Sequence, residues 1–394
     1  MSLQKISERN IKTFYIVESC RSLVFIIPMW IAFLQNRIST SEIAIYVSML
    51  LLTQLLLELP TGAFADLVGK RVTIIIAYGV DAIQYLLFGF AHTFVQFIVL
   101  AAISGLAEAL RSGSLEAIVY DSLKQDGKEE SFRKVMANQG TRFQIGLILA
   151  TLIGGYVAPY WAPLPFILSG IPLVIAALMS YRFIEPKIDL EIFTLKNYLW
   201  KIKMGSMEAF KTVRHRYMSL YYIAVGSISW MCATYFSDYV LIDLGFDTSM
   251  RGVISSGIRI INVVLIYKLL SNEKLFSFRN TIIFFPIIMV LGLLPGQWLF
   301  GVWGIPFVGI VMMSSTARWI LLGKYTNAVF ESKYRATAIS TLSMAIGIVY
   351  VIGVTISGPI MERYGDSRLI YTLLGILSLI TLPPLAYKVL KNYE

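Results

Sequence analysis

Twelve stretches of about 20 mostly apolar residues follow one another along the chain, and each is long enough to cross a membrane as an α-helix. Only 15% of the 394 residues are charged and 57% are hydrophobic, whereas about 25% are charged in an average soluble domain. We therefore predict an all-α integral membrane protein, because a helix satisfies its own backbone hydrogen bonds in lipid. The predicted spans are 13–35, 42–61, 72–91, 95–119, 137–158, 164–182, 217–241, 250–270, 281–300, 302–323, 337–358 and 368–387.

The same composition excludes several other classes of protein. A chain this apolar is neither disordered nor a nucleic-acid-binding protein, and it does not match an ordinary soluble enzyme. Cys20 and Cys232 lie in apolar stretches and indicate no disulfide framework. His92 and His215 stand far apart in the sequence, so no zinc site is expected. We expect no metal, no cofactor and no nucleic-acid partner.

The positions of the basic residues predict how the chain is oriented. If the N-terminus lies inside, most of the 34 lysines and arginines fall in the N-terminal segment, the even-numbered loops and the C-terminal tail. Arg37, Arg251, Arg363 and Arg368 then fall outside. Because cytoplasmic loops are enriched in lysine and arginine, we predict a multi-pass protein of the cell (cytoplasmic, or inner) membrane with both termini in the cytoplasm.

The longest connection between spans divides the chain into two halves. It interleaves basic and apolar residues, as at Trp200 and Lys201, which is typical of a helix lying in the membrane interface. A flexible linker is the alternative. We predict an N-terminal six-helix bundle over 1–183, a cytoplasmic linker with an interfacial amphipathic helix over 184–216, and a C-terminal six-helix bundle over 217–394.

A glycine-rich, charged motif, GAFADLVGKR, connects the second and third predicted spans. Gly62 allows close helix approach, Gly69 allows a tight turn, and Asp66 can accept hydrogen bonds from amides at a neighbouring helix start. Lys70 and Arg71 hold the loop on the inner side. The motif resembles the signature loop of the major facilitator superfamily. That resemblance implies two pseudo-symmetric six-helix bundles, and it implies that these five residues gate the transport pathway.

Two further segments resemble the proton-coupled drug and metabolite efflux group of that superfamily. Residues 108–116 resemble the arginine-bearing fourth helix of proton-coupled members, with Arg111 as the arginine. The fifth span resembles the glycine-rich motif of antiporters, but Ala150 and Thr151 stand where a glycine and a proline are expected. Small residues in a span also let helices pack closely.

Ionisable side chains inside the spans of the first half are the main candidates for proton coupling. Each costs about 2.5–3.5 kcal/mol near the centre of a spanning helix, so a group of them needs partners or a water-filled cavity. A spacing of three residues places Glu18 beside Arg21, and Glu108 beside Arg111, on one helix face. The candidates are Glu108, Arg111, Glu18, Asp81, Arg21, Glu116 and Arg142.

Two interpretations of these charges stay open. In one, they are structural ion pairs that tie four helices together. In the other, a carboxylate exchanges protons, because removal from water favours its neutral form while a nearby arginine opposes this. Glu108 is the first candidate for the proton-binding group, with Arg111 as its modulator, followed by Glu18 and then Asp81.

The second half has fewer buried charges and more aromatic residues. This combination suits a cavity for an amphipathic or aromatic ligand, and it equally suits ordinary packing and interfacial aromatic belts. The candidates for a substrate cavity are Asp238, Trp230, Tyr235, Arg259, Asn262 and Arg318.

Together these features predict a secondary active transporter that works by alternating access. We expect a monomer in the lipid bilayer that exports a small amphipathic compound, such as a drug or metabolite, by proton antiport. The alternatives are proton-coupled uptake of a small solute, a lipid or lysolipid flippase, and a non-transporting membrane sensor. An intramembrane enzyme lacks a plausible constellation of catalytic groups, and a primary pump would need a partner because no Walker-type loop occurs.

Overall fold

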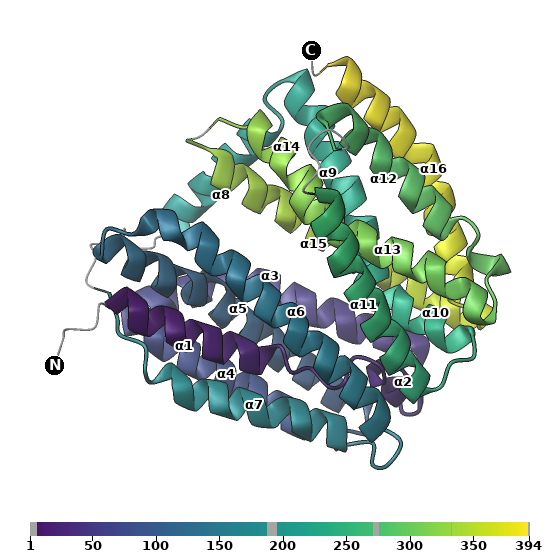
Figure 1. Ribbon diagram of the computed structural model, residues 1–394, viewed down its shortest axis with the longest axis horizontal. Coiled ribbons are helices and arrows are strands. Elements are labelled where there is room, and N and C mark those ends of the chain that lie inside the picture. The colour runs from purple at the N-terminus through teal and green to yellow at the C-terminus, as the bar shows by residue number, and fades with distance from the viewer. Residues whose placement is uncertain (1–5, 187–194, 271–275, 332, 393–394) are drawn as a thin grey trace. The chain divides into compact units, whose positions relative to one another are not determined.

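Every regular element in the described part of the chain is a helix (Figure 1). The computed structural model describes residues 6–186, 195–270, 276–331 and 333–392. The helices of the first half are α1 (Ile6–Arg21), α2 (Trp30–Gln35), α3 (Thr40–Val68), α4 (Lys70–Phe88), α5 (Phe94–Gln125), α6 (Phe132–Val157) and α7 (Leu164–Ser180). Those that follow are α8 (Leu195–Ala209), α9 (Val213–Met231), α10 (Ser237–Asp243), α11 (Thr248–Leu270), α12 (Phe278–Leu293), α13 (Ile305–Ala317), α14 (Gly323–Val329), α15 (Arg335–Tyr364) and α16 (Arg368–Lys391).

The chain divides into two compact units by its internal contacts. The first unit consists of Met1–Ile38, Met49–Leu195 and Thr248–Ser256. The second unit consists of Ser39–Ser48, Lys196–Asp247 and Gly257–Glu394. The predicted domain boundaries after residues 183 and 216 stay a prediction.

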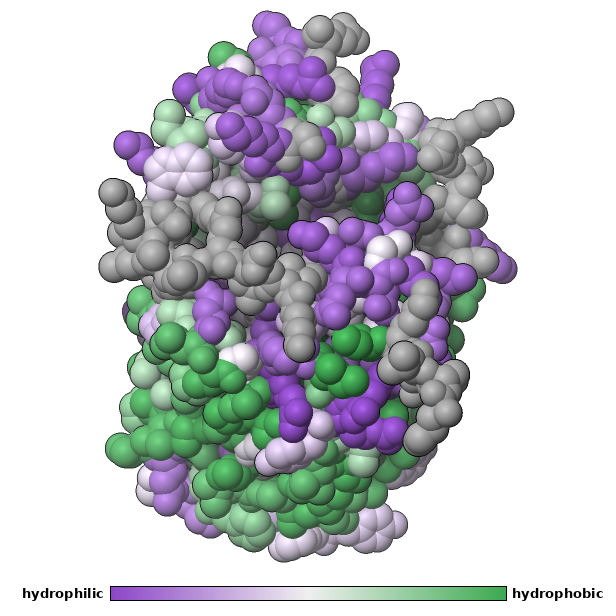
Figure 2. Space-filling model, turned by 90° about the vertical axis from the view of Figure 1, so that its left-hand side faces the viewer, coloured by the Kyte–Doolittle hydropathy of each residue, from purple (hydrophilic) through white to green (hydrophobic). Residues whose placement is uncertain are grey.

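Within the described residues, six helical segments are each long and apolar enough to cross a membrane, and there are two shorter apolar helices, Leu164–Ser180 and Phe278–Leu293. Many large hydrophobic side chains on these helices are exposed, and Figure 2 shows wide hydrophobic areas beside hydrophilic ones on one face. Such a surface suits contact with lipid. The six segments are Thr40–Glu58, Lys70–Phe88, Phe94–Gln125, Gly301–Val329, Arg335–Tyr364 and Arg368–Lys391.

The first predicted span is not one continuous helix, which corrects the expectation for residues 13–35. Helix α1 ends at Arg21, and α2 begins only at Trp30. Pro28 lies between them, and a proline disfavours helical backbone both at its own position and at the residue before it. The freed backbone amide of Phe25 donates to Ser169 Oγ on α7 at 2.9 Å, so the break is anchored to a neighbouring helix.

The predicted glycines of the fifth span pack against this break. A Cβ atom at Gly154 of α6 would lie 1.8 Å from the carbonyl oxygen of Phe25, which no real contact allows. The small residues of α6 therefore serve close backbone approach within the first unit.

Two of the predicted spans of the second unit contain π-helical turns. Cys232–Phe236 joins α9 to α10, and Arg318–Leu322 joins α13 to α14. Such turns occur often at functional sites, because the extra residue re-aims the side chains around it. Tyr235 and Arg318, both predicted cavity residues, lie in these turns.

Helix α8 forms within the predicted linker and is docked to the second unit. The buried carboxylate of Glu208 accepts a hydrogen bond from the backbone amide of Glu331 at 2.9 Å. His215 Nε2 lies 3.5 Å and Lys211 Nζ 3.9 Å from the same carboxylate. The position of α8 in a membrane interface stays a prediction, and residues 187–194 of the linker lie outside the described residues.

Candidate functional site

The first charged pair of the first unit is a saturated ion pair. Arg21 donates from Nε and Nη2 to the two carboxylate oxygens of Glu18 at 2.6 and 2.7 Å. Tyr78 of α4 donates its hydroxyl to the same carboxylate at 2.9 Å, and Gln139 of α6 donates at 3.2 Å. Glu18 is buried, so all its charge is balanced by neighbours from three helices. This geometry indicates that Glu18 serves to hold α1, α4 and α6 together.

The second pair, Glu108 with Arg111, lies on one face of α5 and forms the ion pair that its spacing predicts. Asp81 of α4 is buried, with 7% of its surface exposed. No residue of the described chain forms an ion pair or hydrogen bond with it. The charges that act on Asp81 are those of Glu108, Arg111 and Arg21. The structure therefore brings Asp81 to the Glu108–Arg111 pair without giving it a cation of its own.

Two predicted members of the buried group are exposed. The side chains of Glu116 on α5 and Arg142 on α6 are exposed, which corrects the expectation that both are buried charges. Five residues advance a helix by about 500°, so Glu116 does not share the helix face of Arg111, although its charge still acts together with Arg111, Glu18 and Arg21. The guanidinium of Arg142 lies over the ring of Tyr15, 4.5 Å from its centroid.

The GAFADLVGKR motif is mostly helical, which corrects its prediction as a loop. Gly62 and Asp66 lie in the last turns of α3, and α4 begins at Lys70. Only Gly69 separates the two helices, with a φ of +92° that favours glycine. The motif is therefore a one-residue turn between two long helices.

The amides that open α4 are capped by a residue that the sequence did not reveal. The carboxylate of Glu185 accepts from the backbone N–H groups of Lys70 and Arg71 at 2.8 and 2.9 Å. This is the role predicted for Asp66, and a carboxylate suits it because a helix start carries partial positive charge. Glu185 lies 115 residues from Lys70, so no local pattern could identify it.

Lys70 is buried, so its charge does more than keep this segment on the inner side of the membrane. Its Nζ lies 2.8 Å from Asp121 Oδ2 on α5, and both side chains are almost covered.

We expect Lys70→Met to lower the free energy of unfolding by about 2 kcal/mol, because Asp121 then keeps a buried charge without its partner. Thermal unfolding in detergent measures this. The double variant Lys70→Met/Asp121→Leu should recover most of the loss, and a double variant as unstable as Lys70→Met contradicts the explanation.

In the second unit, Arg318 is fully buried at a π-helical turn. Its exposed fraction is 1%, and its Nε and Nη1 atoms donate to no described residue. Its guanidinium carbon lies 5.3 Å from the ring centroid of Tyr222 and 4.2 Å from that of Trp319. Arg318 thus carries a positive charge held among aromatic rings.

The other predicted cavity residues divide into two groups. Trp230 packs against Tyr350 of α15, with ring centroids 4.6 Å apart. Tyr235 is fully buried among Phe236 and Tyr239, so packing explains it.

The polar candidates of α10 and α11 include Asp238, whose charge also acts on Tyr350 of the Trp230 pair. The charge of Asp238 acts on Arg259, and Asn262 donates to the carbonyl oxygen of Gly309 at 3.5 Å. Sequence reasoning missed Tyr222 and Tyr350, since tyrosines in apolar helices carry no local signal of their contacts.

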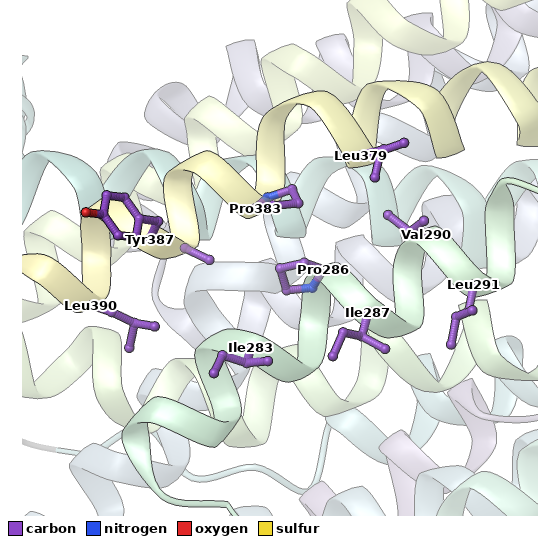
Figure 3. A pocket seen from close by; sticks show the side chains of 10 residues that line it. Ile283, Pro286, Ile287, Val290, Leu291, Leu379, Pro383, Tyr387 and Leu390 are labelled. Atoms are coloured by element: carbon purple, nitrogen blue, oxygen red, sulfur yellow. The ribbon is translucent and has the colours of Figure 1, made fainter.

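A separate apolar groove of about 510 Å³ runs between α12 and α16 (Figure 3). Pro286 and Pro383 face it from the two helices, and Tyr387 lies at one end. Apart from the hydroxyl of Tyr387, its lining side chains are hydrocarbon. This groove suits an acyl chain of the surrounding lipid and offers no charge to a polar substrate.

No group of three or more histidine, cysteine, aspartate or glutamate side chains that could hold a metal ion occurs among the described residues. Both cysteines are free thiols.

A sequence model of the Major Facilitator Superfamily matches residues 15–320, which is more than half of the chain. The chain belongs to the major facilitator superfamily. It is therefore a multi-pass membrane transporter of small molecules and not an enzyme, as predicted.

Curated members of the superfamily resemble this chain at low identity. The uncharacterized MFS-type transporter YxaM of Bacillus subtilis (strain 168) is 23% identical over 366 residues, which cover 90% of each chain. The quinolone resistance protein NorA of Staphylococcus aureus (strain MRSA252) is 22% identical over 213 residues. That match covers 49% of this chain and 54% of NorA, about half of each.

Solved structures of superfamily transporters share the fold. The nucleoside transporter NupG gives a TM-score of 0.74 at 13% identity, over 99% of this chain and 100% of that one. A bacterial homologue of the human lysosomal transporter Spinster gives 0.69 at 14% identity, over 98% and 93%. At such identities the likeness concerns the fold alone. The predicted fold of two six-helix bundles, the major facilitator fold, is confirmed.

Proposed function

We propose that this major facilitator transporter exports a small amphipathic compound in exchange for protons. The observation that carries the proposal is the charge balance of one cluster in the first unit. Glu18, Asp81 and Glu108 supply three carboxylates, whereas Arg21 and Arg111 supply two guanidinium groups. Among these five groups one negative charge is left over, which a single bound proton removes, and the exposed Glu116 adds a carboxylate whose charge acts together with Glu18, Arg111 and Arg21.

The structure favours Asp81 and Glu108 as the carboxylates that share this proton. Glu18 is held by a bidentate arginine and two further donors, so protonation would break several hydrogen bonds. Asp81 loses no hydrogen bond to a described residue when it is protonated. A buried carboxylate without its own cation keeps its charge at a cost, and a proton removes that cost. We therefore place Asp81 before Glu18 as a candidate for the proton-binding group, which is the opposite of the order expected from the sequence.

A proton-dependent change of charge shifts the equilibrium between the conformations of the transporter. In superfamily folds two bundles alternate around a site near the midplane of the membrane. A cluster with net negative charge and the same cluster made neutral differ in how well they tolerate a dry environment. Proton binding from the outer side and release to the inner side therefore drive export of substrate. We place the protein in the cell membrane with both termini in the cytoplasm, as a monomer.

The similarity to NorA, whose name records quinolone resistance, supports export over uptake. The match covers only half of each chain, so it supports the direction of transport and not the identity of the substrate. Arg111 in α5 matches the arginine of the proton-coupled fourth helix, and it pairs with Glu108 as a coupling residue would.

The test is proton flux in liposomes that contain the purified protein, with a dye reporting internal pH. A panel of lipophilic cations, organic anions, sugars and amino acids is added under an imposed pH gradient. We expect a compound-specific proton signal from the wild type. In Glu108→Gln we expect this signal to be lost while exchange of labelled substrate across equal pH continues. Proton flux that is unchanged in Glu108→Gln contradicts the role of the cluster, and substrate flux without any proton signal contradicts coupling.

A further inference from the structure

Arg318 is the largest of the fully buried side chains among the described residues. An arginine stays protonated in proteins, so a positive charge is permanently placed in the interior of the second unit. Among the described residues, the titratable group that acts on it is Tyr222, a neutral phenol. Neither Nε nor Nη1 donates to any described residue. Natural proteins seldom keep a buried charge without a partner, because removing it from water is costly.

The surroundings of Arg318 leave room for its side chain. A Cβ atom on Gly226 of α9 would lie 2.9 Å from Nη1 of Arg318 and 2.5 Å from Cδ1 of Ile346 on α15. Gly226, Ile346 and the guanidinium therefore meet at one level of the helix packing. The rings of Tyr222 and Trp319 cover the guanidinium carbon at 5.3 and 4.2 Å. These rings stabilise the cation without using its N–H donors.

An aromatic pair lies one helical turn from this level. Trp230 is four residues beyond Gly226 on α9, and Tyr350 is four residues beyond Ile346 on α15. Their ring centroids are 4.6 Å apart, and the hydroxyl of Tyr350 is 3.0 Å from Thr234 Oγ1. One turn of helix corresponds to about 5.4 Å. The Trp230–Tyr350 pair therefore lies about one helical turn from the level of Arg318, a separation that one small aromatic ring can span.

We propose that Arg318 binds the anionic group of the transported compound, and that the Trp230–Tyr350 pair receives its ring. The ligand class is a small aromatic anion with a carboxylate or phosphate head. The planar guanidinium presents parallel N–H donors that fit either group in a bidentate pair. This inference rests on the proposed transport function, and it narrows an amphipathic substrate to an anionic one.

The π-helical turn at Arg318–Leu322 supports the assignment. The turn places Arg318 toward the interior and leaves Trp319, the next residue, 57% exposed. A regular helix interior gains nothing from this irregularity, whereas a ligand site uses it to aim one side chain. Gly226 acts as a positioning residue because any side chain there displaces the guanidinium.

The test is calorimetric binding to the full chain in lipid nanodiscs, with empty nanodiscs as the blank and no pH gradient. Three indole probes share one ring and differ in charge: indole-3-acetate, indole-3-acetamide and tryptamine. Phenyl phosphate is the second anion. We expect the wild type to bind at least one of the two anions, and to bind indole-3-acetate at least about tenfold more tightly than the amide and the amine, since hydrogen bonds to charged groups are strong.

Variants separate a ligand role from a packing role. Arg318→Met should abolish the preference for anions, and Arg318→Lys should keep part of it because the charge remains while the bidentate geometry is lost. The control is Arg363→Gln, which removes an exposed arginine of the same unit and should bind like the wild type. Absence of binding by both anions, or an anion preference that survives in Arg318→Met, overturns the proposal.

The melting temperature of the ligand-free protein is a second readout, because a ligand-binding arginine and a structural arginine should change it in opposite directions when they are replaced. An unpaired buried charge destabilises the fold, so Arg318→Met should melt at a higher temperature than the wild type. A melting temperature that falls further than the loss of the contacts with the Tyr222 and Trp319 rings explains overturns the proposal, because it shows that Arg318 has a stabilising partner besides those rings. If the protein binds anions but shows no proton flux, only the proton coupling proposed above is refuted. If cations drive proton flux and no anion binds, only the present inference about Arg318 is refuted.

Discussion

Asp81→Asn is expected to abolish transport driven by a pH gradient and to leave substrate exchange at equal pH intact. The amide has the shape of the carboxylate but binds no proton in this range, so the cluster stays neutral throughout the cycle. Asp81 makes no hydrogen bond or ion pair with the described residues, and its replacement therefore strands no partner. We expect gradient-driven flux to fall by at least about tenfold, as is typical when one proton-transferring group is removed. Flux in liposomes as a function of external pH measures this.

The matched control for Asp81 is Glu116→Gln. Glu116 is an exposed acid on α5, and its charge also acts together with Glu18, Arg111 and Arg21. We expect this variant to keep gradient-driven flux and a normal dependence on pH. Equal loss in Asp81→Asn and Glu116→Gln would show that general charge, and not the buried carboxylate, matters. Full coupling in Asp81→Asn would exclude Asp81 as the proton-binding group.

Glu18→Leu is expected to destabilise the first unit more than any other single change named here. Arg21 would lose a bidentate partner at 2.6 and 2.7 Å, while Tyr78 and Gln139 would lose their acceptor. Breaking a buried pair by removing one partner costs about 3–5 kcal/mol. We expect a correspondingly lower free energy of unfolding, measured by thermal or denaturant unfolding of the purified protein.

Two further variants test this explanation of Glu18. Glu8→Gln changes an acid of the same helix that is half exposed, and it should leave stability within about 0.5 kcal/mol of the wild type. Glu18→Gln keeps the shape and part of the hydrogen bonding, so its loss should be smaller than that of Glu18→Leu. If Glu18→Gln unfolds like the wild type and also stops proton coupling, Glu18 is a proton site and not a structural centre.

Short-range geometry explains which site features were predictable. Glu18 and Arg21, like Glu108 and Arg111, are three residues apart, and the helical period alone brings each pair together. The GAFADLVGKR motif likewise depends on neighbours in sequence, and Gly69 takes the backbone conformation that its position requires. The sequence did not show that Glu185 caps α4, or that Asp121 pairs with Lys70. These partners are 115 and 51 residues away.

The sequence by itself determined the class of this protein: apolar stretches of spanning length leave its backbone no alternative to helices in lipid, and one motif with a matching span pattern indicated the superfamily. Only the tertiary structure decided which charges are balanced. Glu18 is saturated by three helices, whereas Asp81 and Arg318 are buried without a charged partner among the described residues. The reason is physical, because the cost of a buried charge depends on the atoms within a few ångströms of it, and packing between distant segments supplies those atoms.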